Sequence, residues 1–298
     1  MMDDAVVSFS AGSLMLLNGI LAVVMFSIAI DLKPSDFRAF TKAPKPLIVG
    51  LLSQFVLLPV LTYLLVIVVQ PQASVALGLI LVAACPGGNI SNFITHRAGG
   101  NTALSVSMTA FSTVGAILLT PFNIAFWGSL YAPSASLLRS TQIDPVNIAI
   151  TVGLMLILPL ILGITLNNRR PALTARLRGP LQLTSMAIFV GFVAIALAAN
   201  WSTFLAFAGG IAGLVMVHNA LGLGAGYALA TLAGLTPFDR RAVTIETGIQ
   251  NSGLGLVLIF GFFGGLGGMA VVAAFWGIWQ AISGLVLAQL MSRTQAGR

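Results

Sequence analysis

Residues 246–255 read ETGIQNSGLG, a stretch that places one carboxylate, two amides and three glycines inside an apolar run. Glu246 is the only glutamate of the chain, and no other charged residue lies between Arg241 and Arg293. A similar stretch, CPGGNISN at residues 85–92, interrupts another apolar run earlier in the chain. Both stretches indicate helices that are broken in the middle of their apolar segments.

The surrounding composition is that of a membrane protein. Of the 298 residues, 58% are hydrophobic and 7% are charged, and the mean hydropathy is +1.02. Soluble domains carry about 25% charged residues. Several apolar runs of about 18 residues or more predict membrane-spanning helices. These runs are longer and more continuous than the alternating strands of a membrane barrel, so the sequence predicts an all-α polytopic membrane protein.

We predict nine transmembrane helices, at residues 11–30, 46–69, 73–95, 102–130, 146–167, 181–199, 202–233, 241–262 and 264–292. If the N-terminus lies outside, 13 of the 14 Lys and Arg residues fall on the cytoplasmic side, and only Arg139 lies outside. This bias follows the positive-inside rule, so we expect a cytoplasmic C-terminus in a bacterial inner membrane. The net charge of +7 is then an orientation signal and does not indicate nucleic-acid binding.

The two interruptions occupy matching places in the chain. Residues 46–130 and 202–292 each hold three predicted spans, with the interruption in the middle one. Matching interrupted helices in two halves are the best sequence indication of a transporter binding site. Because three is an odd number, the two copies would have opposite orientations in the membrane. We therefore predict an inverted repeat whose two interrupted helices cross near the midplane.

A bound cation is the expected partner of Glu246. A carboxylate inside a membrane is costly unless it faces the bundle interior with a partner. Neutral oxygen donors are plentiful near the two interruptions: Ser91, Asn92, Thr95, Ser105, Thr109, Gln250 and Asn251. Neutral oxygens with one carboxylate favour a monovalent hard cation such as Na⁺, because divalent cations usually recruit more carboxylates. Two alternatives stay open: a protonated Glu246 that acts as a proton relay, and glycines that only serve helix packing.

At these residues the chain resembles the bile acid:sodium symporter family. CPGGNISN followed by NTALSVSMT is similar to the family's first crossing helix and the helix after it. ETGIQN is similar to the second crossing helix, and Gln54, in SQFVLLP, stands where the family has a glutamine on the preceding helix. The resemblance covers nearly the whole chain and fits the nine-span form of the family.

The resemblance implies two sodium sites and a substrate site. The first sodium site would use Ser91, Asn92, Ser105, Thr109 and Glu246. The second would use Gln54, Glu246 and Gln250, with the backbone carbonyls of Thr247 and Ile249. The substrate would lie beside Asn89 and Asn251, with Gln280 in a facing position where some relatives place a histidine. The family fold implies one transporter domain, residues 1–298, with a core (46–130 and 202–292) and a panel (11–30 and 146–199).

These features predict a sodium-coupled secondary active symporter that imports an organic anion by alternating access, with two Na⁺ per substrate. A bile acid, a steroid conjugate or a small carboxylate would fit, and the other partner is membrane lipid. No organic cofactor and no enzymatic activity are expected, since the chain lacks paired aspartates, a Ser/His arrangement and an HExxH motif. A proton-coupled or uncoupled carrier on the same fold, or an anion sensor, is the alternative. His218, in mid-span, is expected to form a helix-to-helix hydrogen bond.

Overall fold

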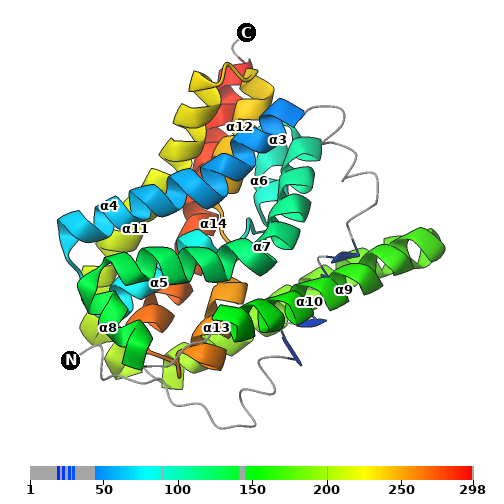
Figure 1. The fold of residues 1–298 in the computed structure, drawn as a ribbon. Helices are drawn as coiled ribbons and strands as arrows, with labels where there is room; N and C mark the ends of the chain where they lie inside the picture. The colour runs from blue at the N-terminus through cyan, green and yellow to red at the C-terminus, as the bar shows by residue number, and fades with distance from the viewer. Residues whose placement is uncertain are drawn as a thin grey trace.

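The computed structural model describes residues 19–20, 22–23, 26–27, 29–30, 44–88, 90–140, 145–199 and 201–296. The helices in these ranges are α3 (Pro44–Leu52), the π-helical η3 (Ser53–Leu57), α4 (Leu58–Val69), α5 (Ala73–Ala84), α6 (Ile90–Arg97), α7 (Thr102–Leu130), α8 (Ala132–Ser140), α9 (Pro145–Arg169), α10 (Pro171–Ala199), α11 (Trp201–Leu232), α12 (Pro237–Gly248), α13 (Ser252–Phe262) and α14 (Gly267–Ala296) (Figure 1). The all-helical prediction is confirmed for these residues. Most of the predicted span 11–30 lies outside them.

Four described helical segments are long and apolar enough to cross a membrane: Pro44–Val69, Thr102–Leu130, Gly209–Leu232 and Gly267–Arg293. Large apolar side chains on these segments face outward; Leu232 is 85% exposed and Leu118 is 72% exposed. Extended apolar surfaces of this kind are rare on soluble monomers and are typical of surfaces that meet a membrane. The class of polytopic membrane protein is supported, and the count of nine spans stays a prediction.

Both predicted interruptions are breaks between half-helices. The chain leaves helical geometry between α5 and α6 and again between α12 and α13. Pro86 disfavours the helical region for the residue before it, and Cys85 accordingly has an extended backbone with ψ of 154°. Ile249 is extended as well, with φ of −117° and ψ of 107°.

The two breaks cross and pair through their backbones. An isolated antiparallel β-bridge joins Gly87 and Gln250. The flanking hydrogen bonds run from Gly88 N to Ile249 O at 2.9 Å and from Asn251 N to Pro86 O at 2.8 Å. Unwound backbone inside a membrane needs such partners, because no water is available to satisfy it. Each break thus supplies hydrogen-bonding groups that the other lacks.

Glycine is needed at the crossing because the two backbones touch. A Cβ on Gly88 would lie 2.7 Å from the carbonyl oxygen of Gln250, and a Cβ on Gly87 would collide with the carboxylate of Glu246. The first neighbour is backbone and has little freedom to move away. A side chain at Gly88 would therefore force the broken segments apart, and one at Gly87 would displace the Glu246 carboxylate.

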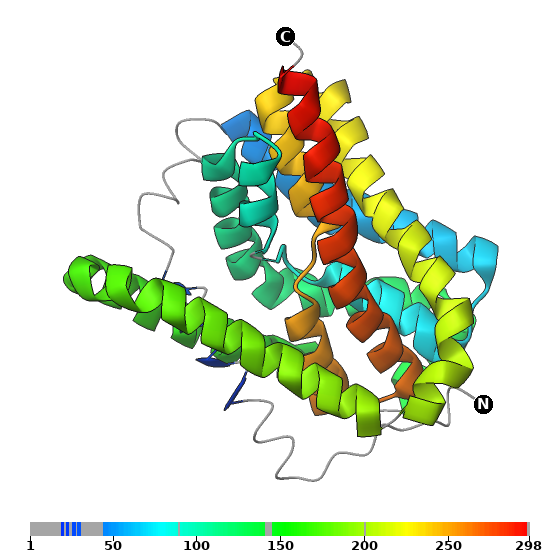
Figure 2. The ribbon, with the colours of Figure 1, turned by 180° about the vertical axis from the view of Figure 1, so that it is seen from behind.

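The described helices repeat one order around the crossing: a long helix, a broken helix and a second long helix. The first set is α3–η3–α4, α5/α6 and α7, and the second is α11, α12/α13 and α14. α5 is buried along its whole length, and a Cβ on its Gly78 would lie 3.0 Å from atoms of Met269 and Val272. Figure 2 shows α14 passing along both broken helices. This order agrees with the predicted repeat, whose inverted orientation stays a prediction.

The turn between α6 and α7 is tied to the start of α12. Arg241 Nη1 donates to the carbonyls of Ala98 and Gly99 at 3.1 Å and 3.0 Å. Asn101 Nδ2 donates to Asp239 Oδ1 at 2.7 Å. α3, α12 and the C-terminal end of α14 lie at this same end of the molecule (Figure 1). These three segments, which the sequence predicts to share the cytoplasmic side, therefore lie together, while the side itself stays a prediction.

α9 and α10 form a pair that extends beyond the other helices in Figures 1 and 2. α9 packs on α7, where Leu160 forms a small apolar cluster with Ala29 and Ala110. The hydroxyls of Ser27 and Ser185 lie 2.8 Å apart, so described residues of the first predicted span contact α10. These contacts agree with a panel of residues 11–30 and 146–199, although the division into core and panel stays a prediction.

Candidate functional site

The carboxylate of Glu246 lies at the crossing and is 1% exposed. Ser91 Oγ and Ser105 Oγ donate to its Oε2 at 2.5 Å and 2.8 Å, and Thr109 Oγ1 donates to its Oε1 at 2.5 Å. These hydroxyls come from α6 and α7, in the first half of the chain, whereas Glu246 belongs to α12. One buried carboxylate therefore joins both halves.

Local structure explains why these side chains meet. Ser105 and Thr109 are four residues apart on α7 and so share one face. Ser91 lies in the first turn of α6, directly after the first break. Glu246 lies in the last turn of α12, where the helix dipole disfavours negative charge and favours a cation. A cation next to this carboxylate would therefore be stabilised by both the carboxylate and the helix dipole.

Asn92 completes the first predicted sodium set. It is half-buried, and its Oδ1 lies 3.4 Å from Thr109 Oγ1. The structure therefore brings together all five residues that were predicted for the first site. Their oxygens comprise one carboxylate, three hydroxyls and one amide, the donor set that suits a hard monovalent cation.

The second predicted set also lies at the crossing, where Gln54 contacts residues of both breaks. Gln54 Nε2 donates to Cys85 O at 3.0 Å and to Gln250 Oε1 at 2.6 Å. Gln250 Nε2 donates to Thr247 O at 2.7 Å, and Ile249 O accepts the bond from the first break described above. The side chains and carbonyls of this set are therefore neighbours, while the hydrogen bonds of the Glu246 carboxylate run to the first set.

Two oxygens in this region have no hydrogen-bond partner among the described residues. Both Gln54 Oε1 and Thr247 Oγ1 are fully buried. A buried polar atom without a partner costs roughly 1–3 kcal/mol, so unsatisfied acceptors are expected to have a further ligand. Gln54 also sits in the π-helical turn η3, and π-helical turns occur frequently at functional sites.

The three residues predicted to contact the substrate lie in different environments. Asn89 lies outside the described residues. Asn251 is half-buried, and its Oδ1 accepts from Leu254 N at 3.0 Å, which caps the N-terminus of α13. Gln280 is 5% exposed and is hydrogen-bonded to the backbone of Gln250. Contact of these residues with a substrate stays a prediction.

Sequence reasoning missed several side chains that satisfy the broken backbone. Thr120 Oγ1 donates to Ala84 O at 2.6 Å, and Asn219 Nδ2 donates to Gly248 O at 2.8 Å. Asn219, a polar residue in the middle of an apolar helix, could have been noticed for that reason. Thr120 could not, because a threonine in a membrane helix commonly bonds its own backbone.

His218 fulfils the role predicted for it. Its Nε2 lies 2.6 Å from Thr62 Oγ1, which joins α11 to α4. Thr62 Oγ1 also lies 2.7 Å from Leu58 O, so this hydroxyl contacts both the His218 ring and the backbone of its own helix. The His218 ring also packs on Trp276, with 4.6 Å between ring centroids.

Comparison with known proteins identifies the family. Residues 19–207 match the Sodium Bile acid symporter family. The uncharacterized sodium-dependent transporter YocS of Bacillus subtilis is 31% identical over 92% of this chain and 82% of its own length. This chain belongs to the sodium bile acid symporter family. The family is one of transporters and not of enzymes, as the sequence had predicted.

Other relatives of this symporter-family chain occur in plants and animals. The probable sodium/metabolite cotransporter BASS1 of Arabidopsis thaliana is 30% identical over 92% of this chain and 66% of its own length. The sodium-dependent organic anion transporter of Mus musculus is 29% identical over 85% of this chain and 71% of its own length. These names differ in the transported solute, so membership of the family leaves the solute open.

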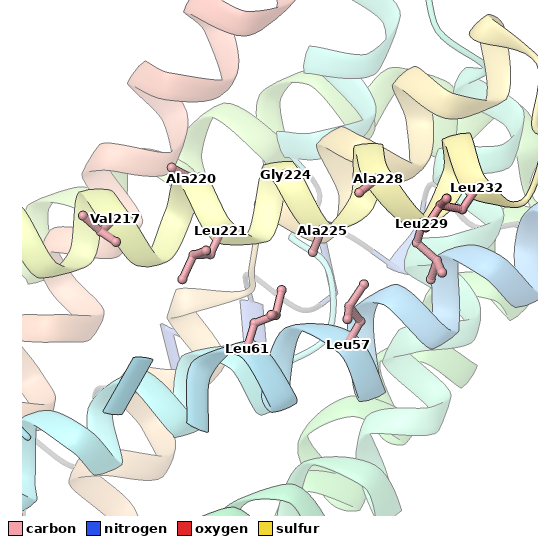
Figure 3. A pocket seen from close by; sticks show the side chains of 10 residues that line it. All are labelled: Leu57, Leu61, Val217, Ala220, Leu221, Gly224, Ala225, Ala228, Leu229 and Leu232. Carbon is pink, nitrogen blue, oxygen red and sulfur yellow. The ribbon is translucent and has the colours of Figure 1, made fainter. Parts of the chain in front are cut away.

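The described residues of this family member also form an apolar groove of about 640 Å³ between the continuous η3–α4 helix and α11 (Figure 3). Its lining is limited to leucine, valine, alanine and glycine: Leu57, Leu61, Val217, Ala220, Leu221, Gly224, Ala225, Ala228, Leu229 and Leu232. A site for an organic anion needs polar groups to hold the charge. This groove offers none, so it does not suit the charged part of such a substrate.

Proposed function

We propose that this protein is a sodium-coupled symporter that imports an organic anion by alternating access. The observation that carries the proposal is the buried Glu246 carboxylate, held by Ser91, Ser105 and Thr109 at the crossing of two broken helices. A lone carboxylate in this position needs a cation. The donor set around it is rich in neutral oxygen, and no group of three or more His, Cys, Asp or Glu exists among the described residues. Such a set favours Na⁺ over a transition metal.

Two Na⁺ are proposed, one in each set of oxygens. The first binds among Ser91, Asn92, Ser105, Thr109 and Glu246. The second binds among Gln54, Glu246 and Gln250, with the carbonyls of Thr247 and Ile249. The unsatisfied Gln54 Oε1 supports this second site, because it is a buried oxygen that lacks a donor among the described residues.

The proposed cargo is an organic anion of the bile acid, steroid conjugate or small carboxylate class. The names of the relatives, a sodium-dependent organic anion transporter among them, support this class. Asn251, at the start of α13, is the described side chain that we place beside the anion. Helix N-termini favour negative charge, so the start of α13 is suited to this task.

The energetics of import are adequate. Two Na⁺ with one monovalent anion carry one net positive charge inward. The membrane potential contributes about 2.3 kcal/mol per 100 mV for that charge, and the sodium gradient adds to it. Each tenfold accumulation of the anion needs about 1.4 kcal/mol. The core would move against the panel in a bacterial cytoplasmic membrane, with the N-terminus outside and the C-terminus inside.

Thermal unfolding of the purified protein in Na⁺ and in equimolar K⁺ tests the proposal. Na⁺ at about 100 times its dissociation constant is expected to stabilise the folded state by roughly 2.7 kcal/mol. Glu246→Gln keeps the shape of the side chain but removes its charge, so the variant is expected to fold and to lose this stabilisation. Uptake of taurocholate, a conjugated bile acid used as a probe, is expected to require Na⁺ in the wild type.

Two results would contradict the proposal. Equal stability of the folded wild type in both salts would favour a proton-coupled or uncoupled carrier on the same fold. Wild-type sodium dependence in Glu246→Gln would refute the assignment of the sodium site to this carboxylate.

A further inference from the structure

Gln280 holds the backbone of the second break from the side opposite to the first break. Its Oε1 accepts from Gln250 N at 2.7 Å, and its Nε2 donates to Gln250 O at 2.9 Å. One side-chain amide therefore pairs with both backbone groups of one residue, as a neighbouring β-strand would. The first break occupies the other edge of the segment through Ile249 and Asn251.

The orientation of this amide is determined by Trp276. Trp276 Nε1 donates to Gln280 Oε1 at 2.8 Å. Because the indole nitrogen can only donate, the amide atom that faces it must be the oxygen. The amide nitrogen then has to face Gln250 O, which is an acceptor. Trp276 is one helical turn before Gln280 on α14, fully buried and packed on His218.

Close approach of α14 allows the amide to reach this backbone. Gly277 and Gly284 lie on the same face as Gln280, at the i, i+3 and i+7 spacing of a helix. A Cβ on Gly277 would lie 2.7 Å from Ser252 Oγ, and a Cβ on Gly284 would lie 3.0 Å from Ile249 Cδ1. Gly277 therefore lets α14 approach the start of α13, and Gly284 lets it approach both Ile249 and Ile94 of α6.

We propose that Gln280, oriented by Trp276, is a positioning residue that fixes the backbone of Gln250 and with it the geometry of the second sodium site. This inference rests on the proposed function, since Gln250 and the carbonyls beside it are proposed sodium ligands. It assigns Gln280 a structural partner in the break, whereas the resemblance placed it at the substrate. Both hydrogen-bonding groups of its amide are engaged by protein in this structure.

The test is a Na⁺ titration of the purified full-length protein at constant total Na⁺ plus K⁺, followed by the thermal unfolding midpoint. Gln280→Met retains the length of the side chain and removes its three hydrogen bonds, two to Gln250 and one from Trp276. The Na⁺ concentration for half-maximal stabilisation is expected to rise roughly 10- to 100-fold, the usual effect of losing a group that orients a metal ligand. Gln289→Met, at an exposed position of the same helix, is the matched control and is expected to match the wild type.

A second pair of variants separates positioning from general stability. If Gln280 acts through Gln250, the double variant Gln250→Met/Gln280→Met shifts the half-maximal Na⁺ concentration by less than the product of the two single shifts. Trp276→Phe keeps an aromatic ring, smaller than the indole, and removes the donor, so it is expected to give a smaller rise. If Gln280→Met does not fold, the Trp276→Phe titration decides the question.

The outcomes are distinct. A lower unfolding midpoint in K⁺ with an unchanged half-maximal Na⁺ concentration would overturn the inference, because it would show a purely structural or a substrate-contact role for Gln280. An absence of any Na⁺ stabilisation in the wild type would instead overturn the proposed function, and the inference with it.

Discussion

At the scale of single residues, the site depends on hydroxyl groups that converge on one carboxylate. Ser91, Ser105 and Thr109 all donate to Glu246, although they belong to two other helices. A hydrogen bond to a charged group contributes about 1.5–3 kcal/mol. The same oxygens are the proposed ligands of Na⁺. Each hydroxyl is therefore expected to influence both the stability of the protein and its affinity for the cation.

Thr109→Val tests this double role, because valine has the same shape and lacks the hydroxyl. The loss of the hydrogen bond is expected to lower the stability in K⁺ by about 1.5–3 kcal/mol. The loss of the proposed oxygen ligand is expected to raise the half-maximal Na⁺ concentration. Thr113→Val is the matched control one turn later on α7, where the hydroxyl donates to the carbonyl of Thr109 within the helix. A Na⁺ titration of thermal unfolding measures both; equal shifts in the two variants would contradict the prediction.

At the scale of helices, α11 shows how glycine position decides packing. A Cβ on Gly226 would lie 2.8 Å from Thr244 Cα and from Val243 O of α12. A Cβ on Gly222 would lie 3.3 Å from Thr247 O. Gly224, two residues from each, has nothing within 4 Å and lines the apolar groove of Figure 3. One face of α11 thus fits the backbone of the broken helix, and another face is open.

Gly226→Ala is expected to destabilise the protein by about 1–3 kcal/mol, the usual cost of adding a methyl group to a well-packed site. Its neighbours are backbone atoms of α12, which cannot turn aside as a side chain can. Gly224→Ala, the control, is expected to be neutral or to stabilise by up to about 1 kcal/mol through helix propensity. Thermal unfolding of both variants is the measurement, and a Gly226→Ala midpoint at or above that of Gly224→Ala would show that the packing is looser than described.

At the scale of the whole molecule, hydrogen bonds tie helices around the crossing to one another at both ends. At the basic end, Arg241 bonds the carbonyls of Ala98 and Gly99. At the other end, Tyr131 Oη donates to Pro71 O at 2.9 Å, which joins the end of α7 to the start of α5. These ties agree with a core that moves as one unit against α9 and α10, as alternating access requires.

The orientation of the whole molecule can be tested by cysteine labelling, because Cys85 is the only cysteine and is buried. Ser129→Cys places a thiol at the exposed end of α7 that we predict to be outside, and Arg293→Cys places one at the basic end of α14. A membrane-impermeant maleimide is expected to label Ser129→Cys in right-side-out vesicles and Arg293→Cys only after permeabilisation. The wild type is expected to stay unlabelled, and the reverse pattern would invert the assigned topology.

The sequence by itself determined the membrane class, the two breaks and the importance of Glu246. These conclusions depend on local sequence. Long apolar runs are stable in lipid, and Pro86 followed by two glycines ends a helix. A single carboxylate in an apolar run needs a partner. The family motifs added Gln54 and the division of the oxygens into two sets, which local reasoning could not supply.

Only the tertiary structure decided which groups meet at the crossing. Three contacts there join residues that are at least 30 positions apart in the chain. They are the β-bridge between Gly87 and Gln250, the hydrogen bond from Thr120 to Ala84 O, and the hydrogen bonds between Gln280 and Gln250. The packing of the helices decides which polar side chain bonds a distant backbone group. The hydrophobic pattern of each helix does not determine this packing. The unwound backbone needs hydrogen-bond partners inside the membrane, and these partners come from several different helices. They can therefore be identified only once the packing of the helices is known.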